Sequence, residues 1–309
     1  MHLAGVCSTD LEMVRGYYPF EGIPGHEFIG LVADENGHPG LRGNRVVGDI
    51  NISCGTCERC LCGGLSQCVC LKTLGIFNYN GVFAEYSKLP AKNLVSVQDS
   101  VSDVLAVFIE PTATALRILD QVRVKPSDRV IVVGAGRLRL LITQALKNTG
   151  CDLKVVVRRP EPAAILEGWG IQALTAAEVK GDLADIVVEV TGSPEGFALS
   201  WSLTHARGTL VLKSTFAGEL SIDLSHCVVD EITLIGSRCG NYQAGLQALT
   251  SGLIQVGEMV DSFFSLDQGS EAISHTSQPD FESADQGLKA IHLYCGFGIL
   301  IQVQNGFAF

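Results

Sequence analysis

The second half of the chain alternates short apolar runs with helical patterns, and this alternation constrains the fold more than any other feature. Strands that are apolar along their whole length, with helices between them, form parallel sheets covered on both faces. The sequence therefore predicts an α/β fold with a doubly wound parallel sheet over residues 112–255. We expect strands at 129–133, 153–157, 186–190, 209–212 and 231–235, and helices at 112–121, 138–147, 162–168, 195–204 and 242–250.

The first 111 residues have a different character. Short apolar runs are broken by Gly-His, Asn-Gly and Cys-Gly pairs, which is typical of a β-rich domain with many loops. These runs cover residues 28–33, 45–50, 82–86 and 93–97. We expect this β-rich domain over residues 1–111, and a third segment over residues 256–309. In that last segment, the sequence predicts a strand and a turn at 259–266 and a loop from residue 274. The final stretch shows no clear hydrophobic periodicity.

Eleven cysteines, six of them between positions 54 and 70, indicate a metal site. An odd number of cysteines in a chain with no visible signal peptide argues against a disulfide framework. The spacing C-x2-C-x2-C-x7-C lets four thiolates surround one tetrahedral ion, and a closed shell of this kind is structural. Reactive or disulfide-linked cysteines are the alternative, and Cys62 and Cys70 are surplus. The predicted ligands are Cys54, Cys57, Cys60 and Cys68.

A second metal site with an open position is the next hypothesis. Catalytic zinc takes three protein ligands and keeps one position free. Cys7, His26 and either Glu27 or a later carboxylate would supply them. Glu110 is a candidate because it sits in an apolar run, where a carboxylate requires a cation or a proton. The alternative is that Cys7 and His26 are ordinary structural residues.

A glycine-rich turn follows the first predicted strand of the doubly wound domain. Gly134 and Gly136, placed between a buried strand and a helix, would let a diphosphate approach backbone N–H groups at the helix N-terminus. The third position of the G-x-G-x-x-G pattern is Arg139, a side chain that crowds the contact between helix and strand. The next strand ends in Arg158 and Arg159, which favour NADP over NAD. A solvated loop is the alternative for these two arginines.

Charge and hydropathy exclude two classes of partner. Lys and Arg number 22 against 33 Asp and Glu, so the net charge is 22 − 33 = −11, which opposes nucleic-acid binding. The apolar stretch at 293–309 is interrupted and is shorter than the ~20 residues of a membrane-spanning helix. No signal peptide is visible at the N-terminus. We therefore expect a cytoplasmic protein, although organellar targeting stays open.

These motifs, in this order, resemble the zinc-containing medium-chain alcohol dehydrogenase family over about residues 3–265. The polyol and threonine dehydrogenase-like branches are most similar, because Glu27 follows His26 and Glu110 precedes Pro111. The resemblance rests on six local matches, which are Gly5-Val6-Cys7-Ser8-Thr9-Asp10, Gly25-His26-Glu27, the four cysteines of the predicted closed site, Gly81-Val82-Phe83-Ala84-Glu85-Tyr86, Glu110-Pro111 and Val133-Gly134-Ala135-Gly136.

The resemblance implies a GroES-like catalytic domain over residues 1–111, a Rossmann domain over residues 112–255, and a return to the catalytic domain over residues 256–309. It implies one catalytic and one structural zinc ion, NADP or NAD as cofactor, an alcohol or polyol as substrate, and a possible homo-oligomer. Thr9 takes the position of the hydroxyl that relays the alcohol proton, and Asp10 that of the carboxylate that orients His26. The resemblance also implies that Cys7, His26 and Glu27 are zinc ligands, and that Glu110 is a ligand or exchange partner.

Three departures from the family lead to alternative hypotheses. The chain begins almost at the Gly-x-Cys segment, so we expect N-terminal strands of the β domain to be missing. Residues 290–309 do not resemble the family's ending, and Arg139 replaces the third glycine. A non-catalytic zinc-binding relative with impaired cofactor binding is therefore one alternative. A zinc-free relative similar to quinone reductases is another, but the two predicted metal sites argue against it.

Overall fold

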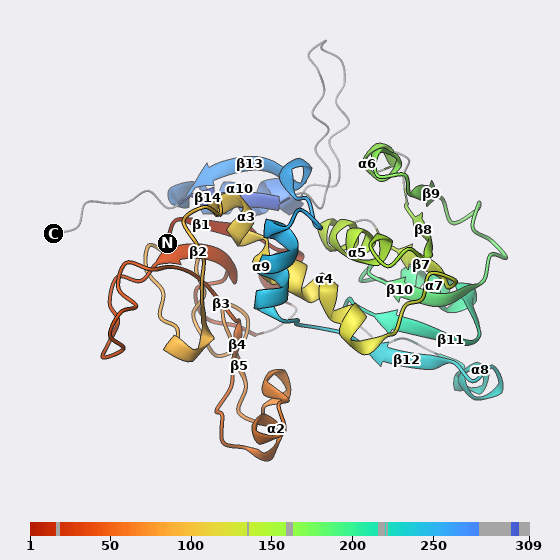
Figure 1. Cartoon of the computed structure of the whole chain (residues 1–309), viewed down its shortest axis with the longest axis horizontal. Coiled ribbons are helices and arrows are strands. Elements are labelled where there is room, and N and C mark those ends of the chain that lie inside the picture. The colour runs from red at the N-terminus through yellow and green to blue at the C-terminus, as the bar shows by residue number, and fades with distance from the viewer. Residues whose placement is uncertain are drawn as a thin grey trace, which may run out of the picture. The chain divides into compact units, whose positions relative to one another are not determined.

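The computed structural model describes residues 1–16, 19–134, 136–158, 163–215, 220, 222–277 and 298–302 (Figure 1). The contacts divide the chain into two compact units, each with its own six-stranded sheet. Unit 1 comprises Met1–Pro111, Tyr242–Thr250 and Gln255–Phe309, and unit 2 comprises Thr112–Asn241 and Ser251–Ile254. Among the described residues, none of the helices combines the length and the apolar character that a membrane crossing requires.

Unit 2 contains the doubly wound parallel sheet that the sequence predicts. Its strands lie in the order β12-β11-β10-β7-β8-β9, and every neighbouring pair is parallel. The strand order therefore reverses between β7 and β10, and ligands of such sheets bind outside the carboxyl ends of the strands at this point. The strands are β7 Arg129–Val133, β8 Asp152–Val156, β9 Gln172–Leu174, β10 Ala184–Glu189, β11 Thr204–Leu212 and β12 Thr233–Gly236.

The helices of unit 2 follow its strands along the chain, as the sequence predicts. Buried apolar side chains from β7, β10 and α7 form one core cluster, which includes Ile131, Val187 and Phe197. The short strand β9 is not predicted, because its three residues form no apolar run. The helices are α5 Arg137–Lys147, α6 Ala163–Gly168, α7 Pro194–Leu203 and α8 Leu224–Val229, and α4 Ile109–Gln121 begins in unit 1.

Unit 1 is β-rich, also as predicted. Its main sheet has the order β13-β14-β1-β2-β3-β6, and β4 and β5 form a separate pair. The strands are β1 Leu3–Val6, β2 Glu27–Leu31, β3 Arg45–Gly48, β4 Asn51–Ile52, β5 Lys72–Thr73, β6 Leu94–Ser96, β13 Val260–Ser265 and β14 Gly298–Gln302. The helices are α1 Ser8–Val14, α2 Glu58–Leu61, α3 Asp103–Val107, α9 Tyr242–Thr250 and α10 Gly269–Ser277, with short 3-10 segments at 65–67, 91–93, 257–259 and 266–268.

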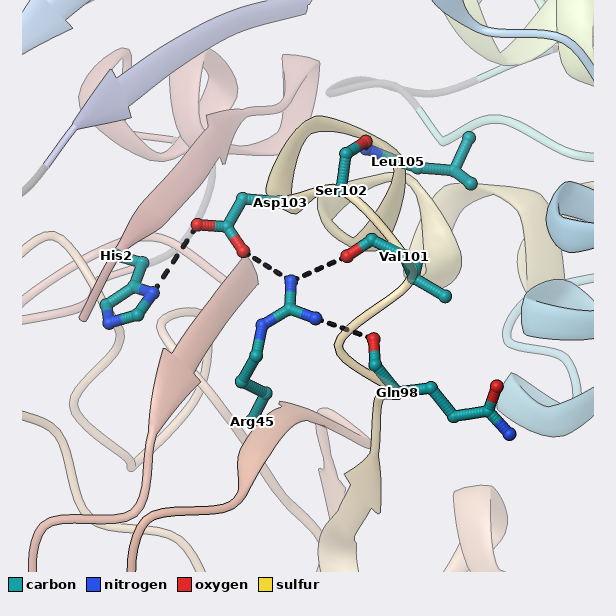
Figure 2. A network of polar contacts seen from close by, with 7 residues as sticks. All are labelled: His2, Arg45, Gln98, Val101, Ser102, Asp103 and Leu105. Carbon is teal, nitrogen blue, oxygen red and sulfur yellow. Dashed lines mark hydrogen bonds and ion pairs between the residues drawn. The ribbon is translucent and has the colours of Figure 1, made fainter.

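A polar network centred on Arg45 joins strand β3 to the segment that precedes α3 (Figure 2). The Arg45 guanidinium donates to the carbonyl oxygens of Gln98 and Val101 at 2.6 and 2.7 Å, and to Asp103 Oδ1 at 2.5 Å. The other carboxylate oxygen of Asp103 lies 3.4 Å from His2 Nδ1. Because the Arg45 side chain is largely buried, these contacts also satisfy a charge that would otherwise be costly to bury.

Some expectations about unit 1 are wrong. Residues 82–86 form no strand, because the N–H groups of Val82 and Phe83 both donate to the Pro24 carbonyl instead of a neighbouring strand. Residues 274–277 are helical and complete α10, where a loop was expected. Helix α9 matches its predicted bounds but belongs to unit 1, where the Tyr242 hydroxyl accepts the Ile50 N–H at 3.3 Å. The strand β14 adds antiparallel pairing to β1 within the stretch 290–309.

Candidate metal and cofactor sites

The antiparallel ladder between β1 and β2 brings together three candidate ligands that are far apart in the sequence. Gly5 is the partner of Glu27 in this ladder, so Cys7, just after β1, lies beside His26, just before β2. One donor atom from each of Cys7, His26 and Glu27 lies within 4.8 Å of the other two. Cys7 is half-buried, and His26 and Glu27 are buried. The strand register therefore builds a compact set of one sulfur, one imidazole and one carboxylate.

Two glycines make room for this group. A Cβ atom at Gly5 would lie 2.5 Å from Glu27 Oε2, so any side chain at position 5 would displace the carboxylate. Gly25 adopts a φ of +92°, a left-handed conformation that favours glycine, and a Cβ there would collide with the Phe83 ring. The glycines of the Gly5-Val6-Cys7 and Gly25-His26-Glu27 segments are thus needed for the geometry of the candidate ligands.

Asp10 holds the two segments that carry these ligands. Its carboxylate is fully buried and accepts the Cys7 N–H through Oδ2 at 2.8 Å and the Gly25 N–H through Oδ1 at 3.2 Å. Asp10 Oδ1 also lies 3.4 Å from His26 Nδ1. Burial by itself lowers the pKa of His26, but the Asp10 carboxylate and the Cys7 sulfur together outweigh this effect, and the pKa is raised well above its ordinary value. Because Nδ1 faces Asp10, the other ring nitrogen is the one suited to a metal ion.

Thr9 and Glu110, the two remaining candidates for this site, differ in how they relate to the three candidate ligands. The Thr9 hydroxyl, in the first turn of α1, lies 3.7 Å from the Cys7 sulfur. Glu110 lies half-buried in the first turn of α4 and is not one of the three residues that form the group of candidate ligands. Thr9 therefore adjoins the group directly, whereas the role of Glu110 stays a prediction.

The four predicted cysteines of the closed site surround a common point. Their sulfur–sulfur distances are 3.4 Å for Cys57–Cys60, 3.5 Å for Cys54–Cys68, 3.9 Å for Cys57–Cys68 and 4.0 Å for Cys54–Cys60. Four sulfurs bound to a central zinc ion at about 2.3 Å would be about 3.8 Å apart, the edge of that tetrahedron. None of the four is in a disulfide. The sulfur positions thus fit a single tetrahedral ion.

Backbone N–H groups support the sulfurs of this cysteine lobe, which we define as residues 54–70. The Cys54 and Cys70 N–H groups both donate to Cys68 Sγ at 3.3 Å. Donors from the backbone and side chain of Thr56 lower the pKa of Cys54 to about 5. Burial raises the pKa of Cys60 to about 12. The surplus cysteines, Cys62 and Cys70, are exposed and are not in the group of candidate ligands.

The glycine-rich turn lies at the carboxyl end of β7, beside the point where the strand order of unit 2 reverses. A Cβ at Gly134 would lie 2.6 Å from the Val190 side chain, so only glycine fits between the ends of β7 and β10. Gly136 is the N-cap of α5 and has open space where its side chain would be. A glycine N-cap offers no side-chain cap to the first N–H groups of the helix, and a helix end of this kind is suited to an anion. Ala135 lies outside the described residues.

Arg139 does not project into solvent from this turn. Its side chain is 1% exposed, and its Nη1 donates to the Gly134 carbonyl at 3.0 Å. The sequence predicts that the Arg139 side chain crowds the contact between helix and strand. The fold accommodates this side chain, because the Gly134 carbonyl in the turn accepts its hydrogen bond. Arg158 follows β8 and is exposed, as expected for a residue that contacts a cofactor or solvent. Arg159 lies outside the described residues.

A buried carboxylate at the end of β10 was missed in the sequence analysis. Glu189 is 2% exposed and accepts four hydrogen bonds, from the Thr191 N–H and hydroxyl, the Gly192 N–H and the Ser214 hydroxyl. It therefore fixes the loops after β10 and β11 at the carboxyl edge of the sheet. The only signal in the sequence is a glutamate that ends an apolar run, which could have been recognised as a residue that needs donors.

Comparisons with known proteins indicate the same family as the sequence motifs. The alcohol dehydrogenase GroES-like domain matches residues 1–99, and the zinc-binding dehydrogenase family matches residues 140–252. D-arabinitol dehydrogenase 1 of Uromyces fabae is 29% identical over 295 residues, which cover 88% of this chain and 84% of that protein.

Solved structures extend the similarity to nearly the whole fold. The alcohol dehydrogenase rspB of E. coli CFT073, in complex with NADH, is similar with a TM-score of 0.84 and 26% sequence identity. The match covers 97% of this chain and 90% of the rspB chain. A candidate zinc-binding dehydrogenase of Sinorhizobium meliloti 1021, bound to NADP, has a TM-score of 0.83 and 25% identity, with the same coverage. Nothing in these comparisons favours the non-catalytic alternative.

Proposed function

This chain belongs to the zinc-containing medium-chain alcohol dehydrogenase family and is an alcohol or polyol oxidoreductase, and we propose that Cys7, His26 and Glu27 hold its catalytic zinc ion. The observation that carries the proposal is the convergence of these three donors within 4.8 Å of one another. Three protein donors of these types fit a zinc site with an open position. The four cysteines of the cysteine lobe would hold a second, structural ion.

When bound, zinc supplies a Lewis acid for the alcohol oxygen, and the nicotinamide ring accepts the hydride. The chain's own residues prepare this chemistry. Asp10 orients the His26 imidazole and ties Cys7 to Gly25, so the ligands are held before the ion arrives. The Thr9 hydroxyl lies beside the Cys7 sulfur, and in this proposal it accepts the alcohol proton and passes it towards solvent. We propose Glu110 as a further ligand or exchange partner.

We propose NADP as the preferred cofactor. Arg158 lies just after β8, the second strand of the parallel sheet along the chain, where a 2′-phosphate would be recognised. Arg159 follows it in the sequence. We expect NADP to bind more tightly than NAD, and Arg158→Gln to weaken NADP binding about fivefold while NAD binding changes little. Calorimetric titration with both cofactors checks this. A preference for NAD in the unsubstituted protein would mean that these arginines are only surface charge.

The experiment that tests the function combines a metal count with an assay. We expect about two zinc ions per purified chain and reduction of NADP or NAD with at least one member of a panel of polyols and simple alcohols. A preparation with only one zinc ion, held by the cysteine lobe, would exclude the open site. The homo-oligomer and the cytoplasmic location stay predictions, which size-exclusion chromatography and cell fractionation would check.

A further inference from the structure

Arg139 is a buried cation that has no anionic partner in the part of the chain that the structure describes. Its side chain is 1% exposed, and the hydrogen bond from Nη1 to the Gly134 carbonyl is its one polar contact among these residues. Its Nε is buried and makes no hydrogen bond to a described residue. Burial lowers the pKa of Arg139 to about 10, so the guanidinium is protonated at neutral pH. A buried charge of this kind normally has a counter-charge.

The position of Arg139 makes its charge more unusual. The N-terminal end of a helix carries a partial positive charge and favours acidic residues in its first turn. The first turn of α5 has no acidic residue, and it contains Arg137 and Arg139, both of which are buried. The positive end of the helix dipole and the buried charge of Arg139 therefore lie together at this turn. The arrangement attracts an anion.

The approach to this turn is open to a ligand. Among the described residues, nothing lies within 4 Å of the place where a Cβ of Gly136 would be, and this N-cap glycine has no side chain to cap α5. The Arg139 guanidinium reaches the same turn from within the fold, because it donates to the carbonyl of Gly134. A diphosphate at Gly136 would therefore meet backbone N–H groups on one side and have a fixed cation beneath the turn.

We propose that Arg139 is a positioning residue for the diphosphate of the nucleotide cofactor, replacing the close packing of the usual glycine with a buried positive charge. The inference rests on the proposed dehydrogenase function, and it concerns affinity for the phosphates rather than for the nucleoside. Arg139 does not touch the ligand in this arrangement. It fixes the Gly134 carbonyl and supplies the counter-charge for an anion that the open end of α5 binds.

The opposite interpretation is that Arg139 only obstructs the turn. The two interpretations predict effects of opposite sign for Arg139→Gly, the variant that restores the glycine of the fingerprint and is therefore suited to the fold. If Arg139 is a counter-charge, the variant binds the diphosphate more weakly. If Arg139 is an obstruction, the variant binds it more tightly.

The test is calorimetric titration of the full chain with ADP and with adenosine. We expect R139G to raise the Kd for ADP at least about tenfold, the size expected for one charge-assisted interaction, and to change the Kd for adenosine less than about twofold. R139K, which keeps the charge but not the planar fork, should lie between R139G and the unsubstituted protein. R129Q is the control, because Arg129 lies at the opposite end of β7 and is half-exposed.

Each outcome decides between the interpretations. An ADP affinity of R139G that equals or exceeds that of the unsubstituted protein overturns the inference, as does an equal loss of ADP and adenosine binding. If R139G fails to fold, as judged by circular dichroism, R139K and R139Q provide the same comparison, and equal ADP affinity in those two variants overturns it. If the unsubstituted protein binds neither ADP nor the dinucleotides, the proposed function fails first, and this result is distinct from a loss confined to position 139.

Discussion

The two candidate metal sites use similar donor atoms but are built in different ways. In the cysteine lobe, one loop between β4 and β5 supplies all four sulfurs, from positions only 14 residues apart. In the open site, the donors come from the end of β1 and the start of β2, and the ladder between these strands determines whether they meet. A local site therefore depends on the spacing of its ligands, and a long-range site depends on strand register.

Register is a stringent requirement for the open site. A shift of one residue in a strand pairing moves every side chain to the opposite face of the sheet. A slip between β1 and β2 would separate Glu27 from the space above Gly5 and move Cys7 away from His26. Asp10 opposes such a slip, because its carboxylate binds the N–H groups of both Cys7 and Gly25. The cysteine lobe has no comparable dependence on the main sheet.

The largest effect on turnover is expected from removing a ligand of the open site. Cys7→Ala deletes one of the three donors, so we expect loss of one zinc ion per chain and a fall in kcat/KM of about 1,000-fold or more, with the fold retained. The measurement is metal content together with initial rates on the alcohol that the unsubstituted protein oxidises fastest. Cys62→Ala, which removes an exposed surplus thiol, is the control. A Cys7→Ala variant with two zinc ions would contradict the assignment.

A smaller effect is expected from Asp10→Asn. The amide offers one acceptor oxygen in place of two, so one of the Cys7 and Gly25 N–H groups loses its partner and His26 loses a nearby negative charge. We expect the affinity of the open site for zinc to fall about 10- to 100-fold, as is usual when the partner of a metal ligand is changed. Competition with a chelator measures this. Asp34→Asn, at an exposed turn, is the control, and equal zinc release from both variants would argue against a role for Asp10.

The same distinction between local and long-range order explains what the sequence could predict. In unit 2, apolar runs and helical periods indicate the parallel sheet and most of its elements, because central strands such as β7 and β10 are apolar over most of their length. In unit 1, β1 and α1 were not predicted, since four and seven residues give too short a pattern. The run at 82–86 looks like a strand but pairs its N–H groups with Pro24, a contact that sequence spacing does not show.

Among the site residues, the four lobe cysteines could be assigned from spacing, and Cys7, His26 and Glu27 needed the resemblance to a family. Arg139 and Glu189 show the limit of both approaches. A pattern that expects glycine treats Arg139 as a defect, and only the structure shows that its guanidinium has an acceptor at Gly134. Glu189 gives no motif, and its four donors come from two loops that the sheet brings together. Such roles depend on tertiary contacts.

The smallest effect on turnover is expected from Cys57→Ala in the cysteine lobe. The variant should lose one zinc ion per chain, like Cys7→Ala, but its kcat/KM at low temperature should fall by far less than the roughly 1,000-fold loss expected for Cys7→Ala, because its ion does not meet the substrate. Its main effect should be on stability, because a structural ion contributes folding energy directly, and we expect the Tm to fall by about 2–4 °C for each kcal/mol lost. Thermal unfolding and metal content of Cys57→Ala and Cys70→Ala test this, since Cys70 lies in the same loop outside the ligand group. If Cys57→Ala abolished turnover as fully as Cys7→Ala while keeping its Tm, the two sites would not divide structure and catalysis in the way their construction indicates.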